Sequence, residues 1–442
     1  MRDERVQAWR GFGFLLACLC APVYLPGRDY LPALQFQLYM APFSLGLGLG
    51  LWLCLGPLPE RLLKVGLPNS NFRLAALSAL LLAGSLAMHR VQLGRYMVYG
   101  YRSLAGPLLA LDLLGAAGLI FLGRSKVGPQ RAWLGLILAL GAGGMLLSIA
   151  YYPLARERSD MLFLLEQGAQ SWLRGDSLTQ AYQPAPAVQV TYFPGLWLSY
   201  LPAVAGKLDL RLWSLASTLA ASALLWLATP AKRRGLALVL LAAFWLSPWF
   251  QYRHEAYVHG LFLPAAVMAW ALLAQRPWLA ALSLGWLTTQ SQLSWFVAPF
   301  VLWHLRLEHG WGLALGAGTL VSALYAAVVG PYLYSDAADL KANIFGYFEG
   351  SVVDQGPNLS YWLRLALGSK GLRLAQALAL LALFLALAKG LKSPAKALQG
   401  AALALLLFIV LNNVIRDYFY FLPLLLLAFA LVSVPAPAGK RG

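Results

Sequence analysis

The sequence predicts an all-α polytopic membrane protein with about 12 to 14 transmembrane helices. Of its 442 residues, 60% are hydrophobic and only 12% are charged, and the mean hydropathy is +0.65. Soluble domains carry about 25% charged residues. The apolar runs are long and rich in Leu, Ala, Gly and Trp, which favours helices over the short alternating strands of a membrane barrel.

Fourteen apolar segments follow one another along the chain. They are 11–26, 34–57, 73–89, 103–122, 132–151, 211–229, 235–250, 256–275, 277–289, 291–305, 311–332, 371–389, 395–412 and 416–434. A helix that crosses the bilayer needs about 20 apolar residues. Segments 277–289 and 291–305 are shorter, so we expect them to be tilted, partly inserted, or paired as a hairpin. The first segment follows a charged N-terminus and is predicted to be a retained signal-anchor helix.

The net charge of +17 does not indicate a nucleic-acid-binding protein, because the basic residues are scattered between apolar runs. The excess of Lys and Arg in cytosolic loops explains them better, and it predicts a cytosolic N-terminus and a cytosolic tail at 435–442. The loops then assigned to the cytosol contain Arg5, Arg10, Arg61, Lys64, Arg124, Lys126, Lys232, Arg233, Arg234, Lys389, Lys392 and Lys396. With this topology, two long polar insertions, 152–210 and 333–370, both lie on the outer face.

The three cysteines lie in the first two apolar segments, and none lies in a long insertion. We therefore expect apolar packing for Cys18, Cys20 and Cys54, without disulfides or a metal site. Asp112 is a carboxylate inside the fourth segment, where ionisable groups are rare. A protonated or paired packing role and a functional role are both open for it.

The first insertion begins with an acid followed by an amphipathic segment. Asp160 precedes "MLFLLEQGAQSWL", whose apolar residues fit one face of a helix lying along the membrane surface. A carboxylate at that helix's N-terminus, at the boundary of water and lipid, can take a proton from a hydroxyl. It can also cap the helix, and both roles can hold together. Farther on, Tyr192 and its aromatic neighbours suit either an interfacial belt or a binding surface.

These residues resemble the first outer loop of the GT-C superfamily of glycosyltransferases, which use polyprenyl-phosphate sugars. The resemblance is greatest to the mannosyltransferase branch that includes the GPI mannosyltransferase I catalytic subunit and the bacterial polyprenol-phosphate-mannose enzymes. In that pattern an acid follows a transmembrane helix, then come a surface helix ending in small residues, a Tyr, and a Tyr-x-Pro element. The matching residues are Asp160, "GAQSWLRGDS", Tyr182, and "TYFP" with Tyr192 and Pro194.

The resemblance implies that Asp160 is the catalytic base in a GT-C-like bundle with surface helices in two long outer loops. In most relatives the acid follows the first helix, whereas here it follows the fifth. Residues 1–130 are therefore expected to be additional transmembrane helices, and 131–434 the catalytic core. The second insertion, with its "N-x-S" stretch at 358–360, is expected to cover the active site.

Several other polar residues near outer helix ends are candidate substrate ligands. Arg253, His254, Glu255 and His259 form the densest ionisable cluster, which suits a phosphate leaving group or, less well, a metal; a solvated turn is the alternative. The link 288–295 offers Gln290 and Gln292 for hydrogen bonds to a sugar.

Three further cations complete the set of candidate phosphate ligands. They are Lys341 and Arg364 in the second insertion and Arg416 before the last helix. We find no phosphate-binding Gly-rich loop, nucleophile elbow or zinc motif in the sequence.

Together these features predict a multi-pass glycosyltransferase that moves a hexose, with mannose expected, from a polyprenyl-phosphate donor to a lipid-linked or glycan acceptor. The expected setting is a bacterial plasma membrane with the active site facing outward. The expected partners are the donor, the acceptor and membrane lipid; a divalent cation is an open possibility. The alternatives are a polymerase or ligase that uses a diphosphate-linked donor, a lipid-glycan transporter or flippase, and a non-catalytic assembly subunit.

Overall fold

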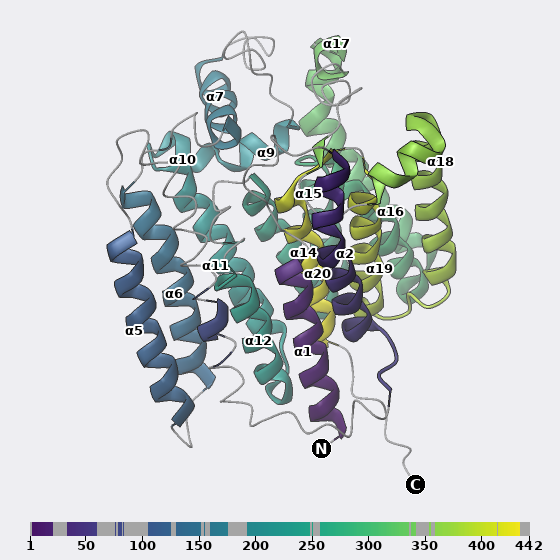
Figure 1. Ribbon diagram of the computed structural model, residues 1–442. Coiled ribbons are helices and arrows are strands. Elements are labelled where there is room, and N and C mark those ends of the chain that lie inside the picture. The colour runs from purple at the N-terminus through teal and green to yellow at the C-terminus, as the bar shows by residue number, and fades with distance from the viewer. Residues whose placement is uncertain are drawn as a thin grey trace.

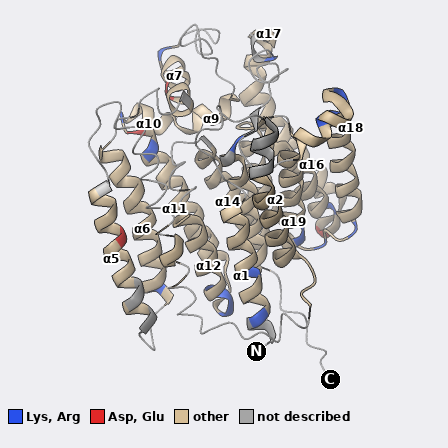
Figure 2. Ribbon diagram, in the orientation of Figure 1, with Lys and Arg blue, Asp and Glu red and all other residues tan. Residues whose placement is uncertain are grey.

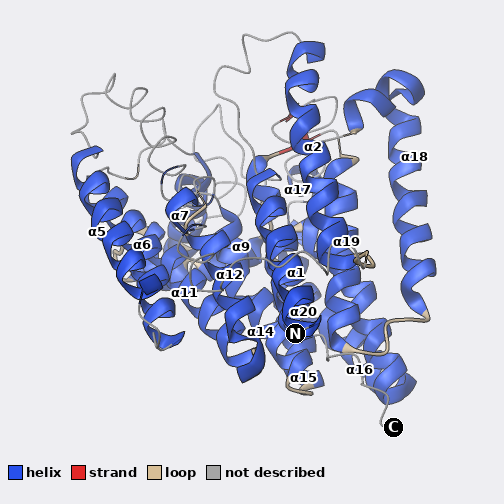
Figure 3. Ribbon diagram, turned by 60° about the horizontal axis from the view of Figure 1, so that its bottom comes forward, coloured by secondary structure: helices blue, strands red, loops and turns tan. Residues whose placement is uncertain are grey.

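The computed structural model consists almost entirely of helices (Figures 1 and 3). It describes residues 2–20, 33–59, 76, 78–81, 83, 105–124, 130–151, 154, 160–175, 192–247, 250, 257–335, 337–341, 353–354, 359–412 and 414–433. Statements below concern these residues.

The longer helices follow the predicted apolar segments closely. They are α1 (Arg2–Cys20), α2 (Ala33–Leu55), α5 (Ala105–Arg124), α6 (Gln130–Tyr151), α11 (Leu210–Ala228), α12 (Arg234–Trp245), α14 (Phe262–Leu273), α15 (Pro277–Thr288), α16 (Ala298–Ser335), α18 (Ser360–Ala388), α19 (Pro394–Val410) and α20 (Phe421–Ser433). The short elements are α7 (Asp160–Arg174), α9 (Pro194–Ser199), α10 (Leu201–Ala205), α17 (Ala337–Leu340), and the 3₁₀ helices η3 (Ala231–Arg233), η4 (Tyr257–Leu261), η5 (Gln292–Phe296) and η7 (Asp417–Tyr420).

Among the described residues, four stretches are long and apolar enough to cross a membrane. They are 130–151, 210–228, 292–335 and 360–388. Five shorter apolar stretches accompany them: 40–55, 106–118, 258–273, 394–410 and 418–433. The chain is thus a helical protein with membrane-spanning character, and a total of about 12 to 14 spans stays a prediction.

Helix α20 forms the centre of the bundle. Every residue from Phe421 to Val432 is buried, and α1, α11, α12, α14 and α19 all contact it. Helices α5 and α18 lie at opposite edges in both views (Figures 1 and 3). Because α1 packs against both α12 and α20, the N-terminal helices are part of the same bundle as the rest.

Close helix crossings depend on glycine, as expected for helices in lipid. A Cβ added to Gly13 of α1 would come 2.7 Å from the Gly50 carbonyl of α2, and the reverse substitution would give the same distance. Cys18 and Cys54 are buried in this region, in line with the predicted apolar packing, and Cys20 is half-buried. Asp112 is half-buried on α5.

Two helices contain sharp breaks at glycine. Gly310 in α16 has φ +86° and Gly368 in α18 has φ +67°, conformations that favour glycine. At Gly310 the chain reverses, and a Cβ on Gly318 would lie 4.0 Å from Leu302 on the preceding half. Segments 291–305 and 311–332 therefore form a tight helical hairpin, whereas the predicted hairpin paired 291–305 with 277–289.

The described parts of both insertions lie at one end of the bundle, opposite the N-terminus (Figure 1). We call this the loop end, and the end where α1 begins the terminal end. The described chain also contains one short strand pair, since β1 (Val353–Asp354) pairs in parallel with β2 (Val414–Ile415). This pair is the only departure from an all-helical structure among the described residues.

Candidate functional site

Helix α7 begins at Asp160 and packs onto the short helices that end the first insertion. Leu162, Leu164 and Leu165 are buried, and Gly168 lies against the ring of Trp197 on α9. Trp172, predicted to share this face, is 48% exposed. The apolar face of α7 therefore contacts protein, in contrast to the predicted helix lying with that face in lipid. The reason is that α9 and α10 supply an apolar surface that the sequence pattern of α7 alone does not reveal.

A buried ion pair lies at the start of α11, close to α7. Asp209 is the N-cap residue, and its Oδ1 accepts hydrogen bonds from the Arg211 backbone N and Nε at 2.9 Å each. Its Oδ2 accepts from Arg211 Nη2 at 2.5 Å, and the same Nη2 lies 3.4 Å from the Ile149 carbonyl. The Arg211 side chain is 1% exposed and that of Asp209 23%. This pair was not predicted, although an acid directly before an apolar helical run is a capping signal.

Glu166 on α7 lies within electrostatic reach of this ion pair. Burial, and secondly the negative charge of Asp209, raise the pKa of Glu166 above its ordinary value of 4.5. Gln170 Nε2 donates a hydrogen bond to Glu166 Oε1 at 3.2 Å. The carboxyl group therefore takes up a proton more readily in the folded protein than in the unfolded chain.

We expect Glu166→Gln to stabilise the protein at neutral pH. Because the pKa of Glu166 is raised in the folded protein, its carboxyl group contributes most to the free energy of unfolding below pH 4.5. This contribution is lost as the pH rises through the folded-state pKa. The amide stays neutral, so the variant's unfolding temperature should vary less with pH above 4.5 than that of the wild type. Glu308→Gln, at an exposed carboxylate of the terminal end, is the control. Parallel pH profiles for wild type and Glu166→Gln would contradict this electrostatic account.

The end of the first insertion is bonded to the link that follows α15. Ser199 Oγ donates to the Gly195 carbonyl at 2.7 Å and accepts from Trp286 Nε1 at 3.2 Å and from Gln290 Nε2. Gly195 N in turn donates to the Thr289 carbonyl at 3.0 Å. The "TYFP" segment and the "TTQSQLSW" link, about 90 residues apart in sequence, are thereby held side by side.

Gln290, singled out as a possible sugar ligand, is only 1% exposed. Since Ser199 has one hydroxyl proton and donates it to Gly195, the Gln290 amide must present its NH₂ group to Ser199. Its Oε1 atom is buried without a hydrogen-bond partner among the described residues. Gln290 thus links α15 to α9 in this structure.

The missing side chain of Gly195 lets α9 approach Thr289 closely. We therefore expect Gly195→Ala to destabilise the protein by about 1–3 kcal/mol. The added Cβ would overlap Thr289 Oγ1 and come 2.7 Å from both the Cβ and the carbonyl oxygen of Thr289. Unfolding temperatures in detergent measure the effect. Gly235→Ala is the control, because nothing lies within 4 Å of its added Cβ, and it should be neutral or stabilising. An equal response of the two variants would show that the contact is not tight.

Aromatic rings fill the space beside this link. Phe193 is fully buried, stacks on Trp295 at 5.5 Å between ring centroids and meets Tyr325 edge-on at 5.8 Å. Tyr192, the predicted ligand, is half-buried and packs against the same hydrophobic core. The structure therefore places Tyr192 at the loop end as expected, next to a Phe whose packing role was not predicted.

The second insertion is bonded to the segment before α20. β1 pairs with β2, which ends directly before Arg416, and Leu359 N donates to the Val410 carbonyl at 2.9 Å. Arg416 and Arg364 are both half-buried, and the Arg364 guanidinium lies 6.0 Å from the Tyr361 ring centroid. One nitrogen of Arg364, Nη1, is buried without a hydrogen-bond partner among the described residues. Lys341 is exposed at the end of α17.

The structure does not support a ligand role for His259, since its side chain is fully buried. It lies between aromatic rings, with centroid distances of 4.7 Å to Phe250 and 5.0 Å to Phe262. Thr218 Oγ1 donates to the Ser214 carbonyl, so it accepts from His259 Nδ1 at 3.1 Å. The predicted site is corrected accordingly: helix packing around η4 has withdrawn this ring into the interior, where no substrate reaches it.

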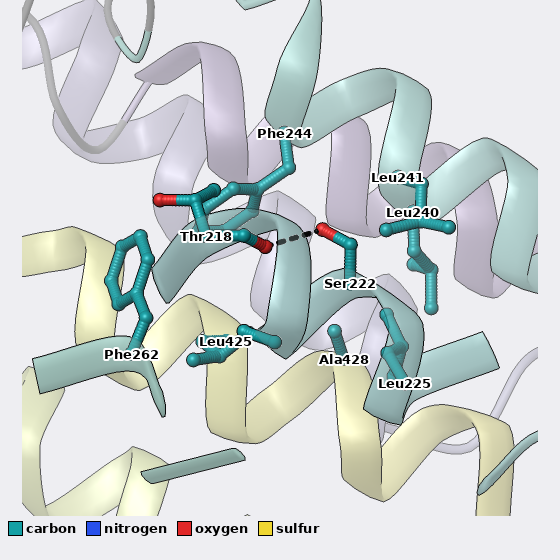
Figure 4. Close-up of a pocket in the computed structure, with 10 residues that line it drawn as sticks. Thr218, Ser222, Leu225, Leu240, Leu241, Phe244, Phe262, Leu425 and Ala428 are labelled. Carbon is teal, nitrogen blue, oxygen red and sulfur yellow. Dashed lines mark hydrogen bonds between the residues drawn. The ribbon is translucent and has the colours of Figure 1, made fainter. Parts of the chain in front are cut away.

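A small cavity lies farther into the bundle, between α11, α12, α14 and α20 (Figure 4). Its volume of about 10 Å³ is about enough for a single water molecule. Ser222 Oγ donates to the Thr218 carbonyl at 2.9 Å and accepts from Trp245 Nε1 at 2.8 Å. With its polar groups bonded and so little space, this cavity is not a substrate site.

The side chains of four predicted site residues lie outside the described part of the chain. Arg253, His254 and Glu255 lie outside the described residues, and of Asp160 the structure describes only that α7 begins there. Among the residues that are described, no three His, Cys, Asp or Glu side chains come together as metal ligands.

The fold and the loop-end contacts define a helical protein of membrane-spanning character. Comparison of the chain with protein-family models, with curated proteins and with solved structures finds no match.

Proposed function

We propose that this protein is a membrane glycosyltransferase that moves a hexose, with mannose as the first candidate, from a polyprenyl-phosphate donor to a lipid-linked or glycan acceptor. One observation supports the proposal most: the helix that begins with Asp160 packs at the loop end, where the described parts of both insertions gather. A base at a helix start, at the same end of the bundle as two half-buried arginines, suits transfer from a phosphate-linked donor.

In the proposed reaction, an acceptor hydroxyl oxygen bonds to the anomeric carbon of the donor sugar. The bond between that carbon and the phosphate oxygen breaks, and the lipid phosphate leaves with the electron pair. Asp160 takes the hydroxyl proton, acting as general base. A single displacement of this kind inverts the anomeric configuration, so product stereochemistry is a further check.

Arg364 and Arg416 are the described candidates for stabilising the leaving phosphate. Both are half-buried, and the β1–β2 pair joins the insertion that contains Arg364 to the segment that contains Arg416. Guanidinium groups form paired, charge-assisted hydrogen bonds with phosphate oxygens. Lys341 is exposed and would contribute by long-range attraction. Arg253, His254 and Glu255 keep their proposed roles as phosphate or acceptor ligands.

The test is transfer of radiolabel by the purified protein in lipid nanodiscs. Polyprenyl-phosphate mannose, polyprenyl-phosphate glucose and a diphosphate-linked oligosaccharide are supplied separately, each with a lipid-linked glycan acceptor. Label transferred from a monophosphate donor supports the proposal. Transfer only from the diphosphate donor would favour a polymerase or ligase, and lipid translocation without transfer would favour a flippase.

A further inference from the structure

An arginine at the terminal end contacts the rings of two tryptophans. The Arg306 guanidinium carbon lies 4.2 Å from the ring centroid of Trp303 and 4.4 Å from that of Trp311. The two rings are 6.2 Å apart and nearly perpendicular, at 89°. Cations are attracted to the faces of aromatic rings at such distances. The two contacts fix the position of a side chain that would otherwise sample many rotamers.

We call Arg306 with Trp303 and Trp311 the clamp. The backbone conformation at Gly310 brings its two tryptophans together. Trp303 lies three residues before Arg306, on the same face of the helix. Trp311 follows the chain reversal at Gly310, where φ is +86°, and so returns beside the guanidinium, with its ring nearly perpendicular to that of Trp303. The clamp is therefore specific to the hairpin of α16 and would not form in a continuous helix.

The loop between α18 and α19 brings further positive charge to the same place. Trp303 Nε1 donates to the Ala388 carbonyl at 3.0 Å, and His304 Nδ1 lies 2.9 Å from the Leu391 carbonyl. Lys389 and Lys392 in this loop are exposed. Figure 2 shows blue, basic segments around this loop. Two hydrogen bonds from the clamp's own helix thus hold a loop with two lysines beside Arg306.

These cations are not neutralised within the described part of the chain. Arg306, Lys389 and Lys392 form no ion pair there, although Glu308 is exposed two residues beyond Arg306. The guanidinium presents several parallel N–H donors, a geometry that matches phosphate oxygens. The chemistry of this cluster is therefore that of an anion site for a phosphate group.

We propose that this cluster binds the phosphate group of an anionic membrane lipid, with Arg306 as the central ligand and Lys389 and Lys392 beside it. Trp311 is 56% exposed, as expected of an indole at the boundary of a membrane. Exposed leucines lie one turn away on both helices, Leu315 on α16 and Leu385 on α18. They offer contacts for acyl chains that a free phosphate ion would not use. Basic clusters between helix ends recognise anionic headgroups in this way.

Native mass spectrometry of the full-length protein tests the proposal. Phosphatidylglycerol and phosphatidylcholine are titrated separately into detergent-solubilised wild type, Arg306→Gln and the control Arg276→Gln. Arg276 is an exposed arginine of the link between α14 and α15 with no such clamp. We expect Arg306→Gln to weaken phosphatidylglycerol binding about fivefold or more, and Arg276→Gln to change it less than twofold. Phosphatidylcholine binding should not respond to either variant.

A second variant distinguishes loss of the lipid site from loss of the fold. Trp311→Leu keeps the charge and changes an exposed ring, and it should weaken phosphatidylglycerol binding while leaving the unfolding temperature close to that of the wild type. Equal effects of Arg306→Gln and Arg276→Gln would overturn the proposal, as would equal binding of the two lipids. Displacement of the lipid by inorganic phosphate at the same concentration would overturn the assignment to a lipid and indicate a site for a free anion.

Discussion

Replacing Asp160 by Asn is expected to lower the turnover of the purified transferase by about 10²–10⁴-fold, the usual contribution of a general base. The amide is nearly isosteric with the carboxylate but cannot accept the hydroxyl proton. Asp160 is the first residue of α7, so its replacement by Asn should cost only the favourable interaction of its charge with the helix N-terminus, about 0.3–1 kcal/mol. The substitution therefore separates the catalytic role from the structural role, and the unfolding temperature should change little.

Two further variants complete this experiment. Asp160→Ala removes the carboxylate and its amide substitute alike and should lose the same activity, with a stability cost of about 0.3–1 kcal/mol for the lost charge at the helix N-terminus. Glu308→Gln, at an exposed carboxylate of the opposite end, should keep full activity. Turnover is measured with radiolabelled polyprenyl-phosphate mannose in nanodiscs. Wild-type turnover in a folded Asp160→Asn protein would rule out Asp160 as the base.

The second large effect is expected at Asp209, whose replacement by Ala should cost about 3–5 kcal/mol of stability. The variant leaves the Arg211 guanidinium buried without the carboxylate that accepts hydrogen bonds from its Nε and Nη2 atoms. It also removes the cap of α11. Loss of an N-cap alone typically costs about 1 kcal/mol, so the greater part should come from the loss of the carboxylate partner of the buried guanidinium.

A series of substitutions can separate these two contributions. Ser393→Ala removes only the N-cap of α19 and so measures the stability cost of losing an N-cap in this protein. Asp209→Asn keeps the cap acceptor while removing the charge, and Asp209→Asn combined with Arg211→Met removes both charges. Unfolding temperatures should fall least for Ser393→Ala, and the double variant should recover much of the loss of Asp209→Asn. If Asp209→Ala costs no more than Ser393→Ala, the buried ion pair contributes little.

Much of the fold could be predicted from local patterns. The apolar runs predicted the long helices because an apolar run of this length is stable in a membrane only as a helix. The amphipathic stretch after Asp160 is helical, and the two prolines at 194 and 202 each occupy the first turn of a short helix. Proline is well tolerated there because the first turn has no intrahelical use for its missing N–H.

The candidate site was less predictable, because it depends on contacts between segments far apart in sequence. His259 looked accessible beside a charged stretch, but its ring is packed among phenylalanines. The ion pair of Asp209 with Arg211 and the clamp around Arg306 were not predicted. In the first case the burial is decided by α6 and α7, and in the second by a reversal at one glycine.

The sequence by itself determined the class of structure, a helical chain of membrane-spanning character, and the positions of most helix ends. Hydrophobicity, glycine and proline act over a few residues and can be evaluated one segment at a time. Only the tertiary structure decided which polar groups are buried, which are paired and which remain exposed at either end of the bundle. Burial and pairing depend on neighbours from other helices, and a one-dimensional pattern does not contain that information.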